Sequence, residues 1–149
     1  MRVPLKTRLL KKRDIPQCIE MAKYNFGGDE KALREDLEAM FNTETWIQPV
    51  FYVIVSKDEI IAMAGYAPDI IDFDCFGVFW VQVKEAYKGQ GYGKMIMKHL
   101  LKAIKKARKK KDTLLMLACD DEMLKFYKKF AFRKMLTKKD GTLIMARNL

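Results

Sequence analysis

The hydrophobic and polar positions along the chain predict strands and helices in alternation. Residues 5–10 can form a first strand. Two helices are expected next, from Asp14 to about Tyr24 and from Asp29 through Met40. Apolar residues recur there at three- and four-residue spacings, which places them on one face of each helix.

Strands are expected to dominate the middle of the chain. Residues 51–55 and 60–66 are rich in β-branched residues and form a predicted hairpin, and Pro68 ends its second strand. A further strand, residues 78–83, leads into a glycine-rich turn. The continuous apolar run at 113–119 is typical of a central strand that is covered on both faces.

Two helices and a second hairpin complete the predicted order. The helices are expected at residues 96–107 and 123–130, and the closing strands at 131–136 and 142–146. The order is strand, two helices, three strands, helix, strand, helix and two strands. It predicts an α/β fold, with helices layered on a mixed sheet, and a single domain over residues 1–149.

Composition narrows the class of protein. The chain has 149 residues, of which 50% are hydrophobic, so it can bury a substantial core. No apolar run approaches the roughly 20 residues of a membrane span, and the first residues lack a secretory pattern. We therefore expect a cytoplasmic protein without a membrane partner. Three widely spaced cysteines, Cys18, Cys75 and Cys119, are expected to be reduced thiols and to bind no metal.

The formal net charge of +10 suits an anionic cofactor or a polyanionic partner. Much of this charge lies at the end of one predicted helix, in Lys102, Lys105, Lys106, Arg108, Lys109, Lys110 and Lys111. Cations at a helix C-terminus complement its dipole, and long basic side chains solvate well. No stacking motif or helix-turn-helix pattern accompanies these residues. We interpret them as a solvated helix face and do not expect nucleic acid to be a partner.

The segment 78–94 contains the most informative pattern, a strand, a basic glycine-rich turn and a helix. Gly89, Gly91 and Gly93 let the backbone approach a phosphate closely, and free N–H groups at a helix start attract anions. The glycine spacing excludes the dinucleotide fingerprint. A nucleotide-triphosphate loop would need Ser or Thr after Lys94, where the chain has methionine. The pattern predicts a pyrophosphate cradle.

The turn resembles that of the GNAT superfamily of N-acetyltransferases, whose [Q/R]-x-x-G-x-[G/A] loop binds the pyrophosphate of acetyl-CoA. Residues 88–93 match this loop, with Lys88 in place of Gln or Arg. Residues 124–132 resemble the closing motif of the family, with Ala131 in place of a glycine. The element order matches along almost the whole chain. The resemblance implies a mixed, mostly antiparallel central sheet of about seven strands flanked by about four helices.

The same resemblance implies how acetyl-CoA, the expected co-substrate, is bound. Backbone amides of the turn hold the pyrophosphate, and backbone groups of the preceding strand hold the pantetheine arm. Asp120 stands where the family has an asparagine near the last helix. The implied cofactor contacts are Val81, Gln82, Val83, Lys88, Gly89, Gln90, Gly91, Tyr92, Gly93, Lys94 and Asp120.

The implied reaction is direct transfer of the acetyl group to a primary amine, on a small molecule or a peptide. A backbone N–H near Val83 can face the oxyanion of the tetrahedral intermediate. Tyr127 corresponds to the tyrosine that returns a proton to the departing thiolate. The pattern alone favours core packing of Tyr127 on an amphipathic helix, and the catalytic role comes from the resemblance.

The sequence does not assign a general base. Residues 76–80, where some family members carry a glutamate, contain no carboxylate. Glu85 is interpreted as a solvated charge, His99 as a surface histidine and Asp74 as a weak candidate. The connection before the strand also contains Asp69 and Asp72. These are expected to be exposed carboxylates, with an acidic surface for an amine as the alternative.

Two alternatives therefore remain open at the level of the sequence. The first is an active N-acetyltransferase whose amine acceptor is not specified. The second is a non-catalytic GNAT-like module that binds CoA or a partner, and it is motivated by the missing strand carboxylate. A homodimer formed through terminal strands is compatible with either alternative.

Overall fold

The computed structural model describes residues 4–44, 47–68 and 74–149, and within them seven strands form one sheet in the order β1-β2-β3-β4-β5-β7-β6. The strands are β1 (Leu5–Leu9), β2 (Val50–Ser56), β3 (Glu59–Pro68), β4 (Cys75–Val83), β5 (Leu114–Cys119), β6 (Arg133–Thr137) and β7 (Leu143–Asn148). The α-helices are α1 (Ile15–Phe26), α2 (Glu30–Glu38), α3 (Tyr92–Ala107) and α4 (Leu124–Lys128). Short 3₁₀ turns are η1 (Lys12–Asp14), η2 (Ala39–Phe41), η3 (Glu85–Tyr87) and η4 (Asp121–Met123).

Adjacent strands in this sheet are antiparallel except for one pair, β4 and β5, which is parallel. The helix α3 connects these two strands, as a parallel pair requires a crossover. The mixed, mostly antiparallel sheet with helices on both faces confirms the predicted fold class.

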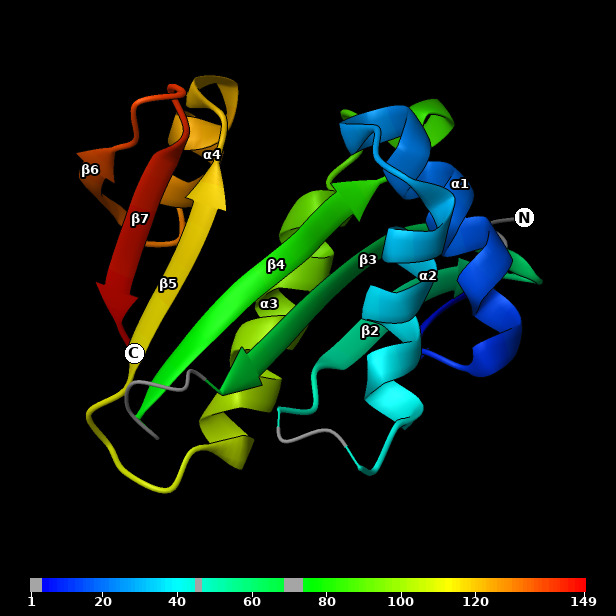
Figure 1. Cartoon of the computed structure of the whole chain (residues 1–149), viewed down its shortest axis with the longest axis horizontal. Coiled ribbons are helices and arrows are strands. Elements are labelled where there is room, and N and C mark those ends of the chain that lie inside the picture. Colours follow the sequence, from blue (N-terminus) through cyan, green and yellow to red (C-terminus); the bar gives the residue numbers. More distant parts are fainter. Residues whose placement is uncertain (1–3, 45–46, 69–73) are drawn as a thin grey trace.

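The helices cover the two faces of the sheet, α1 and α2 on one and α3 and α4 on the other (Figure 1). The apolar stripes read from the sequence explain this arrangement. On the α3 face the fully buried residues of the helix are Ile96, Met97, Leu100 and Ile104. On the opposite face α1 and α2 bury Ile15, Cys18, Ile19, Ala22 and Leu37. The sheet therefore separates two hydrophobic cores.

The start of α2 confirms the predicted position of Asp29, whose carboxylate accepts a hydrogen bond from the Ala32 N–H at 3.1 Å. The start of α1 also agrees with the prediction in position, but its side-chain bonding is different. Asp14 stands at the N-cap position but makes no capping bond to the helix. Its carboxylate instead accepts bonds from Lys11 N–H at 2.7 Å and from Arg8 at 2.6 and 3.0 Å, which ties β1 to the helix.

The last helix is shorter than predicted. α4 contains five residues, and the chain turns back at Ala131, which has a left-handed φ of 65°. The Phe132 N–H donates to the Tyr127 carbonyl at 3.2 Å across this turn. β6 consequently begins at Arg133 rather than at Ala131. The pattern overestimated the helix because Phe130 continues the apolar spacing beyond the turn.

Three further expectations concern a membrane span, the loop carboxylates and His99. None of their helices combines the length and the apolarity needed to cross a membrane. Asp69 and Asp72, considered above as loop carboxylates, lie outside the described residues. His99, interpreted as a surface residue, is half-buried, and its ring packs edge-on against Tyr52 with 4.7 Å between centroids.

Candidate functional site

A β-bulge interrupts β4 at Trp80. Gly65 of β3 pairs with Phe79 and Met63 pairs with Gln82, so two residues of β4 lie opposite the single residue Ala64. Trp80 adopts a left-handed φ of 56°. A bulge of this kind bends the strand and shifts the alternation of its side chains by one position.

The shift places the two ends of β4 in different registers. Phe79 and Trp80 both pack into the core beneath α1 and α2. Val81 and Val83 consequently pack on the α3 side, together with Val78 before the bulge. If the side chains alternated regularly from Val78 onward, Val81 and Val83 would face the α1 side. The bulge thus directs both predicted pantetheine positions toward the face that carries the glycine turn and α4.

β4 and β5 separate after Gly77, before the bulge at Trp80. Their parallel pairing covers only Cys75–Gly77 of β4 and Leu114–Met116 of β5. Figure 1 shows the two strands diverging from this end, with α4 beside β5 and the glycine turn at the tip of β4. The described strand residues from Val78 to Val83 have no β5 partner, so the sheet opens at its centre.

The amide of Val83 faces this opening. The Lys84 N–H donates to the Ile61 carbonyl at 2.7 Å, which makes Ala62 and Val83 a non-hydrogen-bonded pair of the β3–β4 ladder. In such a pair the N–H group points away from the neighbouring strand. The Val83 N–H is therefore available to a ligand between β4 and β5.

The glycine turn lies at the mouth of the opening. Gly89 and Gly91 have left-handed φ values of 77° and 89°, and a Cβ on either would meet nothing within 4 Å. Gly91 is the N-cap of α3, and the first intrahelical bond is Met95 N–H to the Gly91 carbonyl at 3.1 Å. The amides of Tyr92, Gly93 and Lys94 belong to the first turn, whose N–H groups lack intrahelical partners. Lys88, Gln90 and Lys94 are exposed beside them. The turn fits a pyrophosphate, since open space and free donors coincide.

The carboxylate of Glu59 holds the segment that leads into the glycine turn. Glu59, at the start of β3, accepts hydrogen bonds from Lys84 at 2.7 Å and from the Tyr87 hydroxyl at 2.8 Å. These bonds lower the pKa of the Glu59 carboxyl. They hold η3 against the β2–β3 hairpin, immediately before Lys88.

Lys88 is directed toward α1. Its ammonium lies 2.7 Å from Glu85 and 2.8 Å from the Asn25 side-chain oxygen, and it stands over the Tyr24 ring at 5.8 Å. Gln82 likewise faces α1: its amide is buried, accepts from Asn25 at 3.0 Å and donates to the Met63 sulfur at 3.1 Å. Neither side chain is directed into the opening.

Tyr127 comes from α4 on the opposite side of the opening. It is 5% exposed, and its ring packs edge-on against Phe126 and Phe132. Burial, and secondarily the nearby Cys119 thiol, raise the pKa of its hydroxyl, so the group keeps its proton at neutral pH. The ring of Tyr127 is therefore core packing, and the catalytic role of its hydroxyl stays a prediction.

Asp120 follows β5 and is exposed. It occupies the N-cap position of η4, where its side chain makes no capping bond, although its carbonyl accepts from Met123 N–H at 3.0 Å. Its negative charge contributes, after burial, to raising the pKa of the Cys119 thiol.

The carboxylates considered as bases lie elsewhere. Asp74 pairs with Lys110 at 3.1 Å, and its carbonyl accepts from Leu114 N–H at the closed end of the β4–β5 pair. Glu85 is paired with Lys88. Burial, followed by two nearby lysines, lowers the pKa of His99, which lies on α3 against Tyr52.

Comparison with known proteins identifies the family. The profile of the acetyltransferase (GNAT) domain matches residues 48–134, more than half of the chain, and includes β4, the glycine turn, α3, β5 and α4. The chain belongs to the GNAT acetyltransferase family. The match confirms the resemblance read from the turn and assigns this GNAT protein to the acyltransferases.

Solved structures share the GNAT fold over nearly the whole chain. A GNAT-family acetyltransferase from Desulfovibrio desulfuricans superposes with a TM-score of 0.80 at 11% identity, covering 97% of this chain and 99% of that one. The ribosomal-protein-S18-alanine N-acetyltransferase of Escherichia coli gives 0.76 at 18% identity, covering 97% and 94%. PaiA N-acetyltransferase of Thermoplasma acidophilum, solved in complex with coenzyme A, gives 0.69 at 17% identity, covering 98% and 99%. None of the curated proteins matches the chain.

Sequence reasoning missed the bulge and the side chains that brace the turn. Trp80 lies within an apolar run, so alternation could not reveal the inserted residue. Asn25 is separated from Gln82 by 57 positions, and only the packing of α1 brings them together. No local signal marks either one.

Proposed function

We propose that this protein transfers the acetyl group of acetyl-CoA directly to a primary amine on a small molecule or a peptide. The observation that carries the proposal is the Val83 N–H, which points away from β3 toward the opening between β4 and β5. A thioester bound along β4 would have donors for its pyrophosphate at one end and a protonated hydroxyl toward the other. Acetyl-CoA supplies the activated acetyl group.

Each part of this site has a distinct task. The Gly89–Lys94 amides and the α3 N-terminus bind the pyrophosphate, with Lys88, Gln90 and Lys94 at the exposed rim. Val81 and Val83 bind the pantetheine arm through backbone groups, and Gln82 supports that strand from the α1 side. Asp120 borders the opening after β5. We propose that residues 1–149 work as one domain, which the single sheet through all described strands supports.

Tyr127 is proposed as the catalytic acid. The attacking amine adds to the thioester carbonyl, the C–S bond then breaks, and the sulfur leaves as a thiolate. A hydroxyl whose pKa is raised by burial is protonated when the thiolate departs and can donate to it. The Val83 N–H can stabilise the oxyanion that forms on the carbonyl oxygen. With no side-chain base in the proposal, the amine reacts in its neutral form. The proton that its nitrogen releases as the amide forms passes through solvent and restores the Tyr127 hydroxyl.

A two-part experiment tests the proposed function. Calorimetric titration with CoA measures binding, and a panel of small amines, polyamines and peptide N-termini with acetyl-CoA is screened for release of free thiol. We expect CoA to bind and at least one amine to be acetylated. Absence of CoA binding would refute the proposal. CoA binding without transfer to any amine, or to any peptide N-terminus or lysine, would favour the non-catalytic module instead.

A further inference from the structure

The side-chain amide of Asn25 joins three segments that are far apart in the sequence. It is the penultimate residue of α1. Its Nδ2 donates to the Gln82 side-chain oxygen at 3.0 Å and to the Val83 carbonyl at 3.2 Å, and its Oδ1 accepts from the Lys88 ammonium at 2.8 Å. One amide thus contacts the end of β4 and the first residue of the glycine turn.

These bonds restrain the last peptide of β4 from both sides. The N–H of the Val83–Lys84 peptide donates to the Ile61 carbonyl at 2.7 Å, while its carbonyl accepts from Asn25. The next peptide toward the N-terminus carries the Val83 N–H that faces the opening. Fixing the Val83–Lys84 peptide therefore fixes both the direction of that N–H group and the angle at which the chain leaves the sheet for the turn.

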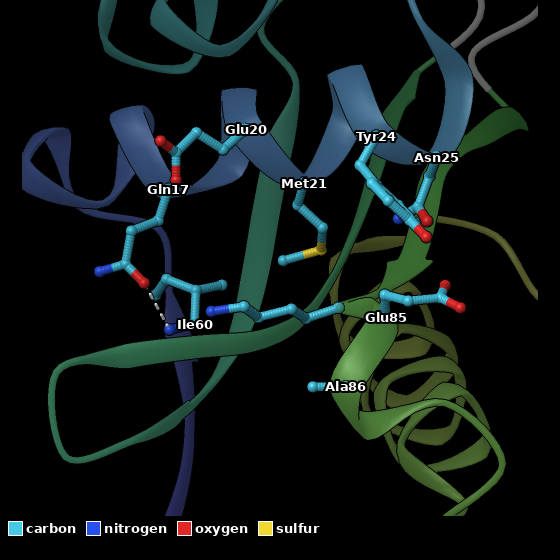
Figure 2. Close-up of a pocket in the computed structure, with 9 residues that line it drawn as sticks. Gln17, Glu20, Met21, Tyr24, Asn25, Ile60, Glu85 and Ala86 are labelled. Atoms are coloured by element: carbon cyan, nitrogen blue, oxygen red, sulfur yellow. Dashed lines mark hydrogen bonds between the residues drawn. The ribbon is translucent and has the colours of Figure 1, made fainter.

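The end of α1 borders a cavity beside the chain that leads to the glycine turn. A cavity of about 440 Å³ lies between α1 and the Lys84–Ala86 segment, lined at its base by Met21, Ile60 and Ala86. Figure 2 shows α1 crossing above it, with Gln17 near one end and Asn25 near the other. Across this space the turn contacts the helix end through Asn25 and through the Tyr24 ring, which lies 5.8 Å from the Lys88 ammonium.

Gln17 makes a comparable clamp at the far end of the cavity. Its Nε2 donates to the Asp58 carbonyl at 2.7 Å, and its Oε1 accepts from the Ile60 N–H at 2.9 Å (Figure 2). These bonds tie α1 to the β2–β3 hairpin and not to the turn. Both amides therefore hold α1 against the sheet. Asn25 bonds to residues of the proposed cofactor site, whereas Gln17 bonds to the β2–β3 hairpin.

We infer that Asn25 is a positioning residue for acetyl-CoA: it holds the end of β4 and Lys88 in the geometry that receives the pantetheine arm and the pyrophosphate. The inference rests on the proposed function, because it concerns the same site. It also means that part of the cofactor site is formed by α1, outside the strand–turn–helix segment.

The test compares Asn25→Ala with Gln17→Ala in calorimetric titrations with CoA, with the free energy of unfolding of each variant measured by urea denaturation. Losing the Asn25 hydrogen bonds is expected to weaken CoA binding about tenfold, the equivalent of roughly one net hydrogen bond. Gln17→Ala should lose comparable stability and keep the wild-type affinity. Equal CoA affinities of wild type and Asn25→Ala, or equal weakening in both variants, would overturn the inference. A wild-type protein that does not bind CoA would instead refute the proposed function.

Asn25→Asp separates the two bonds that the amide donates, to Gln82 and Val83, from the bond that it accepts from Lys88. The aspartate can still hold Lys88, but it cannot donate to Val83 or Gln82, so we expect weakened CoA binding without loss of the Lys88 contact. In the amine assay, Asn25→Ala should raise KM for acetyl-CoA about tenfold and leave kcat and KM for the amine within about twofold. A wild-type affinity of Asn25→Asp, or a loss confined to kcat, would contradict the positioning role.

Discussion

The ring of Phe126 packs against Gly93: a Cβ placed on Gly93 would lie 3.4 Å from two carbon atoms of the ring and 3.7 Å from Val83. This contact joins the start of α3 to α4 beside Tyr127. Gly93→Val should therefore displace α4, destabilise the protein by about 2 kcal/mol through overpacking, and weaken CoA binding. Calorimetry and urea denaturation measure both effects. Gly93→Ala, whose methyl group makes ordinary contacts, is the control and should remain close to wild type.

Tyr127→Phe removes the hydroxyl while preserving the ring packing against Phe126 and Phe132. We expect kcat to fall about 100-fold, as for loss of a general acid, with the Kd for CoA nearly unchanged. Because burial raises the pKa of this hydroxyl, Tyr127 should stay protonated up to about pH 10. Its deprotonation should therefore cause no loss of wild-type kcat in that pH range. Steady-state kinetics against pH check both points. An unchanged kcat in Tyr127→Phe would leave the residue as core packing alone.

Gly91→Ala tests the turn through its backbone. The left-handed φ of 89° should cost an alanine about 1–2 kcal/mol, and relief of the strain would move the N-cap of α3. We expect weaker CoA binding. Gly141→Ala is a matched control, because Gly141 has φ of 91° and equally open surroundings in the β6–β7 turn. If both variants lose stability and only Gly91→Ala loses CoA affinity, the glycine turn takes part in CoA binding. Equal CoA affinities of the two variants would show that the turn does not bind the cofactor.

Ala131 occupies a left-handed position that glycine adopts without strain. Ala131→Gly should therefore increase the free energy of unfolding by about 0.5–1 kcal/mol, the relieved strain less the greater entropy of the unfolded glycine chain. Thermal denaturation measures the change. A destabilised Ala131→Gly variant would show that the alanine methyl contributes packing that outweighs the strain.

Asp14→Asn should lower stability at neutral pH by about 2 kcal/mol, because it removes a charged partner of Arg8. Burial alone would raise the pKa of the Asp14 carboxyl, but the bonds from Arg8 and Lys11 outweigh it and lower the pKa. The stabilisation is therefore present above the unfolded pKa of about 4 and is lost as pH falls through the lower folded value. Urea denaturation from pH 7 to pH 2 should show the wild type and Asp14→Asn converging. Asp36→Asn, at an exposed carboxylate on α2, is the control and should follow the wild type.

Most of the fold could be predicted because each element has a clear period. The stripe through Ile96, Leu100 and Ile104 and the apolar run from Leu114 determine what each segment must bury. Local side-chain bonds fix two of the element ends. Asp29 accepts from the Ala32 N–H at the start of α2, and Asp140 accepts from the Thr142 N–H at 2.9 Å in the β6–β7 turn. Such interactions join residues only a few positions apart, so the sequence alone can predict them.

The remaining features depend on relations between distant segments. Three consecutive apolar residues, Phe79, Trp80 and Val81, carry no trace of the change of face between them. The separation of β4 from β5 after Gly77 concerns two strands that lie far apart in the sequence. Asn25 belongs to a helix whose pattern predicts burial but not which strand its polar end will meet. Sequence periodicity therefore predicted the position of the glycine turn, but not the side chains that support it.

The short parallel pairing of β4 with β5 also affects how the molecule unfolds. Among the described residues, three register pairs join the β5–β7–β6 half of the sheet to the rest, although the buried α3 core spans both halves. A ligand seated between β4 and β5 would bridge the two halves and supply contacts that the strands themselves do not make. Cooperativity between the halves would then depend on ligand occupancy, with the protein behaving as two partly independent folding units when empty and as one when filled.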